Sequence, residues 1–293
     1  GRVIHKTKES DMRFNLPTAD VFVPDGLLIE QALARTTHMA ISAHQDDIEI
    51  MAAAPILECF QQSDKWFSGV VVNDGRNSPR DGLYAYYSDE DMRAVRFKEQ
   101  RKAAVVGEYA AQVILDYPSS AIKDGSNQQV VGDLVSLLKA ARPKYIYTHN
   151  LADKHDTHVG VVLKVIAAIR ALPPVDRPLS LFGCEVWRDL DWMVDTDKVA
   201  FDLSAHEALQ MALLGVFDSQ IAGGKRYDLA SMGRRRANAT YYASHGVDSA
   251  LGTSFAMDLT PLVVDDTLQP LVFVQQHIQR FAQDVVDRFS RLA

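Results

Sequence analysis

Short apolar runs alternate along the chain with longer segments in which apolar residues recur every three or four positions. The short runs are bounded by polar turn residues, which is typical of buried strands, and the longer periodic segments predict helices. The expected strands cover residues 39–43, 69–72, 113–115, 144–148, 182–187 and 200–203. The expected helices cover residues 26–33, 48–62, 89–107, 127–141, 159–172, 206–217 (capped by Ser204) and 225–242.

This alternation predicts an α/β protein with a mostly parallel sheet, because parallel strands need crossover connections that are usually helices. The 293 residues show no internal repeat, low-complexity tract or linker, so we expect a single domain over residues 1–293. Residues 269–293 predict an amphipathic helix that closes the domain or meets a partner, such as a second copy of the chain in a homo-oligomer. The apolar positions of that helix are Leu271, Val274, Ile278, Phe281, Val285, Val286 and Phe289.

The composition excludes several classes of function. Hydrophobic residues make up 47% of the chain and charged residues 24%, as in ordinary soluble proteins. The net charge of −7 argues against non-specific nucleic-acid binding, and no apolar run is long enough to cross a bilayer. The N-terminus shows no signal-peptide pattern, which predicts a cytoplasmic protein. Cys59 and Cys184, the two cysteines, lie in apolar contexts and are expected to be core residues.

Dense polar clusters follow two of the expected strands. His44, Asp46 and Asp47 come directly after the strand at 39–43, and residues 149–158 follow the strand at 144–148. Neighbouring parallel strands end at the same edge of a sheet, where ligands of open α/β proteins bind, so we expect the two clusters to meet there. Ionisable groups flanked by core are costly unless something compensates them, and a divalent metal is the simplest compensation.

The two clusters contain the parts of a catalytic metal centre. His44, Asp47 and His158 would supply two imidazoles and one carboxylate, which with one open position is the arrangement of catalytic zinc. His155 lies three residues before His158 at the start of a helix, so both side chains can face one cavity. Asp46 is adjacent to a ligand without being needed as one, and it could take a proton from water that the metal activates.

The remaining polar residues of the second cluster have supporting roles in this interpretation. His155, if protonated, could stabilise a developing oxyanion and then protonate a leaving amine. Asp153 or Asp156 could orient a histidine from behind. Together these parts predict a metal-assisted amide hydrolase. The alternative is that His44 and the two aspartates only cap and terminate elements through ordinary hydrogen bonds.

A turn-rich loop at residues 76–88 carries three tyrosines, Tyr84, Tyr86 and Tyr87. A loop of that length in a compact domain is usually functional or mobile. The tyrosines could stack on a sugar or form a lid, or they could simply pin the loop to the surface of the protein. Both interpretations stay open at the level of sequence.

Several stretches resemble one known family. Ala43-His-Gln-Asp-Asp47 is similar to the Ala-His-Pro-Asp-Asp-Glu signature of the LmbE/PIG-L family of zinc-dependent N-deacetylases, and His155-x-x-His158 resembles its second, histidine-containing motif. The likeness spans roughly residues 37–255 and has three further parts. These are Asn73-Asp-Gly75, the Arg96-x-x-Glu99-x-x-x-Ala103-x-x-x-Gly107 pattern, and Ser219-Gln220.

The resemblance implies a Rossmann-like three-layer fold and substrates derived from N-acetylglucosamine. It assigns His44, Asp47 and His158 to zinc, with iron(II) as the other metal to consider. It makes Asp46 the base and places His155 beside the tetrahedral intermediate. Arg96 matches a family arginine near the substrate; its alternative role is as an ion-pair partner of Glu99 on the same helix.

The chain also departs from the family pattern. Gln45 replaces the usual proline, and Ile48 replaces the usual glutamate, although Glu49 follows immediately. Thr157 stands where relatives often have an aspartate beside the zinc-binding histidine. In the C-terminal part, Phe217 and Ser254 replace a histidine and a glutamate. These changes leave the expected metal ligands in place, but the substrate of this chain cannot be inferred from the substrates of the family.

The function expected from the sequence is removal of the N-acetyl group from an N-acetylglucosamine-type amino sugar or its conjugate. An amidase that acts on a larger sugar-linked amide, such as a thiol conjugate, is the nearest rival. A metal-dependent carbohydrate-binding protein without turnover is the rival from another class. Asp46 and His155 argue against it, because binding alone needs neither.

Overall fold

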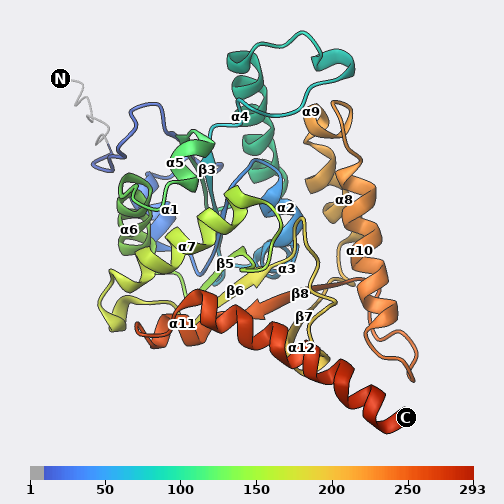
Figure 1. The fold of residues 1–293 in the computed structure, drawn as a ribbon. Helices are drawn as coiled ribbons and strands as arrows, with labels where there is room; N and C mark the ends of the chain where they lie inside the picture. The colour runs from blue at the N-terminus through green and yellow to red at the C-terminus, as the bar shows by residue number, and fades with distance from the viewer. Residues whose placement is uncertain (1–9) are drawn as a thin grey trace, which may run out of the picture.

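The computed structural model describes residues 10–293, and within that range eight strands form one sheet (Figure 1). The order across the sheet is β1-β4-β3-β2-β5-β6-β8-β7. The strands are β1 (Asp20–Phe22), β2 (His38–Ser42), β3 (Phe67–Asn73), β4 (Ala111–Tyr117), β5 (Tyr145–His149), β6 (Ser180–Cys184), β7 (Lys198–Asp202) and β8 (Thr253–Asp258).

The centre of the sheet is parallel and its edges are not. Strands β4, β3, β2, β5 and β6 pair in parallel, and their order corresponds to the 3-2-1-4-5 arrangement of Rossmann-type sheets. In contrast, β1, β8 and β7 each pair antiparallel with their neighbours. The prediction of a mostly parallel sheet is therefore wrong, and the sheet is mixed. The error arises from β1 and β8, which carry no clear apolar run and were not expected from the sequence.

Helices cover both faces of the sheet and give three layers. On one face lie α1 (Ile29–Ala34), α5 (Ser119–Lys123), α6 (Gln129–Ala141), α7 (Asp156–Arg170), α11 (Thr260–Val264) and α12 (Pro270–Leu292). On the other lie α2 (Asp47–Met51), α3 (Ala53–Cys59), α4 (Asp89–Val106), α8 (Glu207–Gly215), α9 (Asp218–Ile221) and α10 (Tyr227–Tyr241).

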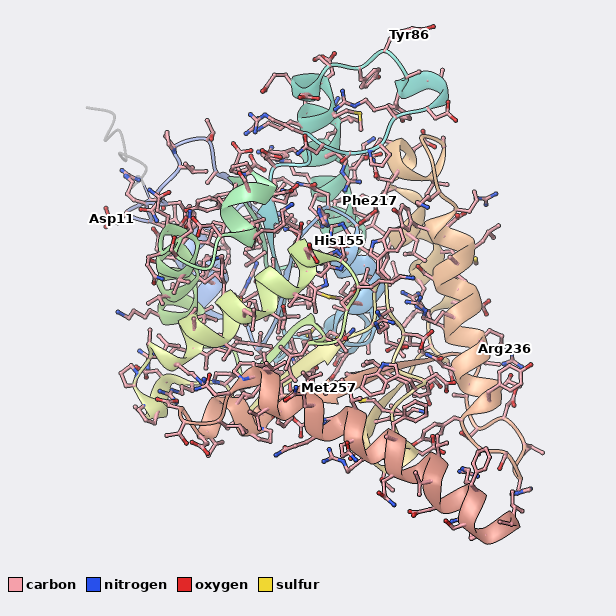
Figure 2. The ribbon with its side chains drawn as sticks, in the orientation of Figure 1. Asp11, Tyr86, His155, Phe217, Arg236 and Met257 are labelled. Atoms are coloured by element: carbon pink, nitrogen blue, oxygen red, sulfur yellow. The ribbon has the colours of Figure 1, made fainter. Side chains whose placement is uncertain are left out.

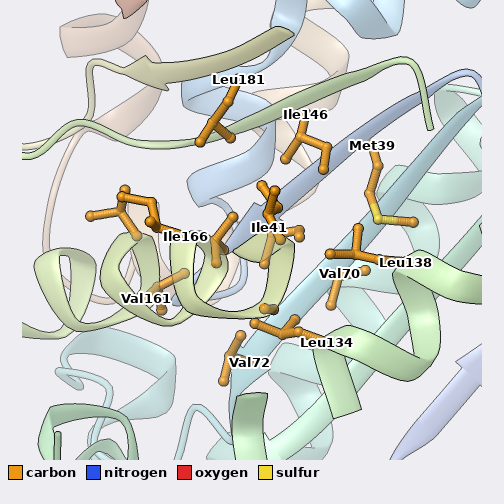
Figure 3. Packing of buried hydrophobic residues seen from close by; sticks show 14 of the residues in the cluster. Met39, Ile41, Val70, Val72, Leu134, Leu138, Ile146, Val161, Ile166 and Leu181 are labelled. Atoms are coloured by element: carbon orange, nitrogen blue, oxygen red, sulfur yellow. The ribbon is translucent and has the colours of Figure 1, made fainter. Parts of the chain in front are cut away.

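The core follows from alternation along the strands. Met39 and Ile41 of β2 point toward α6 and α7, whereas Ala40 between them faces the opposite layer (Figure 3). Both faces of the central strands are buried, as helices on both sides require. This packing fixes where β2 and β5 end, and the two polar clusters begin there.

Two expected helices differ from the structure in detail. The helix expected at 48–62 is interrupted at Ala52, which separates α2 from α3. Pro55 explains the break, because it lacks an N–H group and its ring clashes with the carbonyl four residues earlier. The expected cap at Ser204 is wrong as well. Helix α8 follows His206, which has a positive φ of 54° and makes no capping contact, and the Ser204 hydroxyl donates to Asp202 instead.

The tyrosine loop is held at one point and free at another. Tyr84 is buried, its hydroxyl donates to Asp218 at 2.7 Å, and its ring contacts Tyr87 edge-on. Tyr86 is 99% exposed at the tip of the loop (Figure 2). Tyr84 thus pins the loop against α9, as the second interpretation predicts, and Tyr86 is directed into solvent.

The C-terminal helix is confirmed, and only its first half packs on the domain. Phe273, Val274 and His277 are buried, whereas later apolar residues such as Phe281 and Phe289 are exposed. The second half of α12 runs past the body of the protein (Figure 1). None of the helices in the described part of the chain is long and apolar enough to cross a membrane.

Candidate metal centre

The two polar clusters meet at the carboxyl ends of β2 and β5. These strands are neighbours at the point where the strand order of the parallel core reverses, which is the ligand-binding position of open α/β sheets. His44 and Asp47 follow β2, and His158 lies in the first turn of α7 after β5. The expected meeting of the clusters is confirmed.

Three donor atoms converge between these elements. Nδ1 of His44 lies 3.2 Å from Oδ2 of Asp47 and 3.2 Å from Nε2 of His158, and the same Asp47 oxygen lies 3.2 Å from Nε2 of His158. Burial alone would raise the pKa of Asp47, but His158 and His44 hold that pKa well below its usual range. These three atoms, called the donor cluster below, therefore surround a point at which positive charge is favoured.

This geometry fits a divalent metal. Ligand atoms at about 2.0–2.1 Å from a tetrahedral zinc are separated from one another by about 3.3 Å, close to the three distances above. Burial alone would lower the pKa of His158, but Asp47 and Asp153 raise it to about 9. A proton on Nε2 thus occupies the position of a cation, and a metal would replace it.

Asp153 orients one of these histidines. Its Oδ2 lies 3.0 Å from Nδ1 of His158, which leaves Nε2 directed toward the donor cluster. The same carboxylate accepts the backbone N–H groups of Lys154, Trp187 and Arg188 and is thereby fixed. Asp156, the other residue expected in this role, is exposed and has no hydrogen bond to a histidine within residues 10–293.

His149 is a site residue that sequence reasoning left without a role. It ends β5, is fully buried, and its ring stacks on His158 with centroids 3.9 Å apart. Its Nε2 accepts the backbone N–H of Ala43 at 2.9 Å and lies 3.6 Å from Asp47. Burial lowers the pKa of His149 well below the usual value, so its ring is neutral and fills space beside the donor cluster. Its position as the last strand residue was the available signal.

Asp46 is buried beside the donor cluster. It has a φ of 89° and a side chain that lies 3.7 Å from Nη1 of Arg96. Burial raises the pKa of Asp46 to about 8, Arg96 opposes the shift, and the negative charge of Asp47 adds to it. A carboxyl group in this environment has a proton affinity suited to acid–base chemistry near neutral pH.

His155 borders the same cavity as a neutral imidazole. It is the N-cap of α7, where its Nδ1 accepts the Thr157 N–H at 3.3 Å (Figure 2). Burial, with the charge of His158 second, lowers the pKa of His155 to about 4. The proton of the neutral ring is therefore on Nε2, which can donate a hydrogen bond to an oxyanion without the protonation considered from the sequence.

A cavity of about 740 Å³, the main cavity, is lined by His44, Asp46, Asp47 and His155 and also by two residues with N–H groups that have no hydrogen-bond partner. Arg96 is buried, and one of its nitrogens donates to the carbonyl of Gln45 at 2.7 Å. Its Nε and Nη1, and Nε2 of Gln220, are buried and have no hydrogen-bond partner within residues 10–293. Buried donors of this kind are costly unless a ligand accepts from them. Gln220 was known from the sequence only as part of a family likeness.

The departures from the family pattern are absorbed structurally. Gln45 is buried and donates to the carbonyl of Asn73, which ties the turn after β2 to β3. Ile48 lies in the core. Glu49 does not line the main cavity, so it does not take the place of the missing glutamate there. Instead Glu49 accepts hydrogen bonds from Tyr109 and Gln100.

Thr157 and Phe217 are buried, and Ser254 is partly buried in β8. None of these three residues makes a hydrogen bond from its side chain to the donor cluster within residues 10–293.

Two further residues, Gln100 and Ser219, connect the elements around the site. Gln100 accepts the backbone N–H of Asp46, and Ser219 donates to Glu99, which fixes the turn before Gln220 to α4.

Comparison with known proteins points to one family. The sequence model of the GlcNAc-PI de-N-acetylase family, PIG-L, matches residues 39–169. The uncharacterized deacetylase YaiS of Escherichia coli (strain K12) is 28% identical over 155 residues, which are 52% of this chain and 78% of YaiS.

Two solved structures have the same fold. The N,N′-diacetylchitobiose deacetylase of Pyrococcus horikoshii has a TM-score of 0.56 at 16% identity, over 75% of this chain and 83% of its own. The 4-carboxy-2-hydroxymuconate hydratase GalB of Pseudomonas putida KT2440 has a TM-score of 0.57 at 14% identity, over 76% and 96%. Identities this low concern the fold alone. The match to the PIG-L sequence model does not depend on these structures, and the matched residues 39–169 include both clusters of the site.

Proposed function

We propose that the protein is a zinc-dependent hydrolase that removes the N-acetyl group from an N-acetylglucosamine-type amino sugar or its conjugate. The observation that carries this proposal is the convergence of His44, Asp47 and His158 beside the buried carboxyl of Asp46. A ligand set of two histidines and one aspartate suits zinc, and iron(II) can occupy similar sites. The deacetylase relatives support an amide as the bond that is cleaved.

Each residue of the site then has a defined task. Bound between His44, Asp47 and His158, the metal would polarise the amide carbonyl and lower the pKa of the attacking water. Asp46 accepts the proton of that water. His155 donates from Nε2 to the oxygen on which negative charge develops.

Substrate recognition falls to the buried donors of the main cavity. Arg96 and Gln220 have N–H groups without a hydrogen-bond partner in residues 10–293, although Nη1 of Arg96 also lies 3.7 Å from Asp46. These groups can donate to sugar hydroxyl or carbonyl oxygens. The proton that Asp46 has accepted is then available to the leaving amine. Asp46 thus serves both the attacking water and the leaving amine, whereas His155 serves the oxygen of the amide.

The fold by itself does not decide the reaction, because one structural neighbour is called a hydratase. Hydration adds water across a carbon–carbon double bond, whereas deacetylation releases acetate. The sequence match to deacetylases in the region that holds the site favours deacetylation. An amidase for larger sugar-linked amides and a carbohydrate-binding protein without turnover remain the rivals.

The proposal is tested by metal content together with acetate release. Purified protein incubated with zinc and dialysed is expected to hold about one metal per chain and to release acetate from a member of a panel of N-acetylglucosamine conjugates. Bound zinc with hydrolysis of only larger amides would identify the amidase, and bound zinc without any hydrolysis would indicate the binding protein. Failure to bind any divalent metal would refute the proposal.

A further prediction distinguishes the two candidate orienting aspartates. Asp153→Asn is expected to weaken zinc binding by about 10- to 100-fold, because a neutral amide no longer raises the basicity of His158. Asp156→Asn is the matched control and should leave the zinc dissociation constant within about twofold, since the exposed Asp156 makes no hydrogen bond to a histidine within residues 10–293. Competition with a chromogenic chelator measures both. Equal effects of the two substitutions would contradict the assignment of Asp153.

A further inference from the structure

We propose that a second cavity beside the metal centre binds the aglycone of the substrate, and that this aglycone is an apolar or aromatic group bearing a carboxylate or phosphate. The inference rests on the proposed function and specifies its substrate class. The side cavity has a volume of about 490 Å³ and lies between α10 and the segment that follows β6. Lys154, Trp187, Lys225 and Tyr227 line both it and the main cavity.

The two cavities are joined at Trp187. The centroid of a Trp187 ring lies 6.3 Å from the ring of His155, which lines the main cavity, and 6.3 Å from the ring of Tyr227, which lines both cavities. A sugar placed with its amide at His155 therefore extends past an aromatic wall before it reaches the side cavity. A conjugate can occupy both cavities at once, with the amino sugar at the donor cluster and the aglycone beyond Trp187.

The charged side chains that line the side cavity are all basic, although the chain carries a net charge of −7. They are Lys154, Lys225, Arg226 and Arg234. Arg226 is paired with Asp228 at 2.8 Å. Arg234 donates to the backbone carbonyl of Val186 and faces no carboxylate at salt-bridge distance within residues 10–293.

The two lysines are the cations left for a ligand. Neither Lys154 nor Lys225 forms an ion pair with any described residue, and the ammonium of Lys225 lies 5.3 Å from the ring centroid of Trp187. Unpaired cations around a concave surface create a positive potential that attracts anions. The anionic group of the aglycone lies at the junction of the cavities, whose lining includes both lysines.

The rest of the lining sets the body of the aglycone. Ile50, Val186 and Ala230 contribute apolar surface, and Trp187 and Tyr227 add aromatic rings. A small polar anion alone would leave this surface in contact with water, whereas an apolar or aromatic group would cover it. The chemistry that fits is therefore an anion carried on an apolar body.

The test compares three glycosides of N-acetylglucosamine that differ only in the benzyl aglycone, which is unsubstituted, 4-carboxylated or 4-phosphorylated. Binding is measured by calorimetry with zinc-loaded Asp46→Asn protein that contains residues 1–293, so that the ligands are not consumed. At least one anionic glycoside is expected to bind about tenfold more tightly than the neutral one, and a rise in salt should reduce this preference. The carboxylated and phosphorylated arms identify which anion is favoured.

Substitution of both lysines tests the assignment of the site. Lys154→Gln with Lys225→Gln should reduce the preference to less than about twofold; both residues are exposed, so folding should be retained. Lys139→Gln, an exposed lysine on α6 outside both cavities, is the matched control and should keep the preference. Equal affinity for the three glycosides, or a preference that survives the double substitution, would overturn the inference.

Acetate release by the unmodified protein separates this inference from the proposed function. Release from the neutral glycoside without any anion preference in binding would uphold the hydrolase and reject the anionic aglycone. A lysine-dependent preference without acetate release from any glycoside would uphold the anion site and reject the deacetylase.

Discussion

Replacing Asp46 with asparagine is expected to leave bound zinc in place and to lower the rate of acetate release by about a thousandfold, the usual range for loss of a general base. The amide keeps the shape of the side chain but cannot accept the proton of the attacking water. Metal binding should persist because the three converging donor atoms come from His44, Asp47 and His158. Zinc content and turnover are measured on the same preparation.

A second substitution at position 46 serves as the control for this prediction. Asp46→Glu retains a carboxylate and moves it by one methylene, so partial activity above that of the asparagine variant is expected. Loss of zinc in Asp46→Asn would mean that Asp46 is a ligand. Hydrolysis at an undiminished rate would mean that another group takes the proton, and the base assignment would be withdrawn.

Replacing His44 with alanine is expected to abolish zinc binding at micromolar metal and, with it, hydrolysis. His44 is the suitable ligand for this test because its side chain is 21% exposed, whereas that of His158 is fully buried and its removal would open a cavity. With two donors left, the site no longer has the three protein ligands of a catalytic zinc. Zinc at about 100 times its dissociation constant should stabilise the unsubstituted protein by about 2.7 kcal/mol.

Thermal unfolding with and without zinc measures this effect. The chelator-treated unsubstituted protein should gain several degrees in Tm when zinc is restored, and His44→Ala should gain none. His245→Ala, which removes an exposed histidine outside the main cavity, should respond as the unsubstituted protein does. An undiminished response of His44→Ala to zinc would place the metal elsewhere.

The sequence was sufficient for the centre of the fold and for the meeting of the two clusters. Both follow from local pattern, because an apolar run that ends in charged residues marks the carboxyl end of a buried strand. The edges of the sheet were not predictable in this way. Strand β1 has three residues and forms because it pairs with β4. Strand β8 forms because it pairs with β6 and β7, and such tertiary contacts are not visible in the local sequence.

Within the site, side-chain direction set the limit of prediction. Asp153 and Asp156 are equivalent in the sequence, and only the fold brings the first to His158 and leaves the second exposed. His149 and Gln220 became candidates because the structure shows their burial, the stacking of one and the unpartnered nitrogen of the other. The change of His155 from an expected cation to a neutral donor also depends on burial, which composition cannot reveal.

The backbone conformation and the burial of Asp46 both lower the stability of the fold. A φ of 89° is one that glycine adopts freely and that costs a residue with a side chain about 1–2 kcal/mol. Burial of the Asp46 carboxyl adds to this cost. An aspartate at this position therefore lowers the stability of the fold, a cost that fits the proposed role of Asp46 as the base.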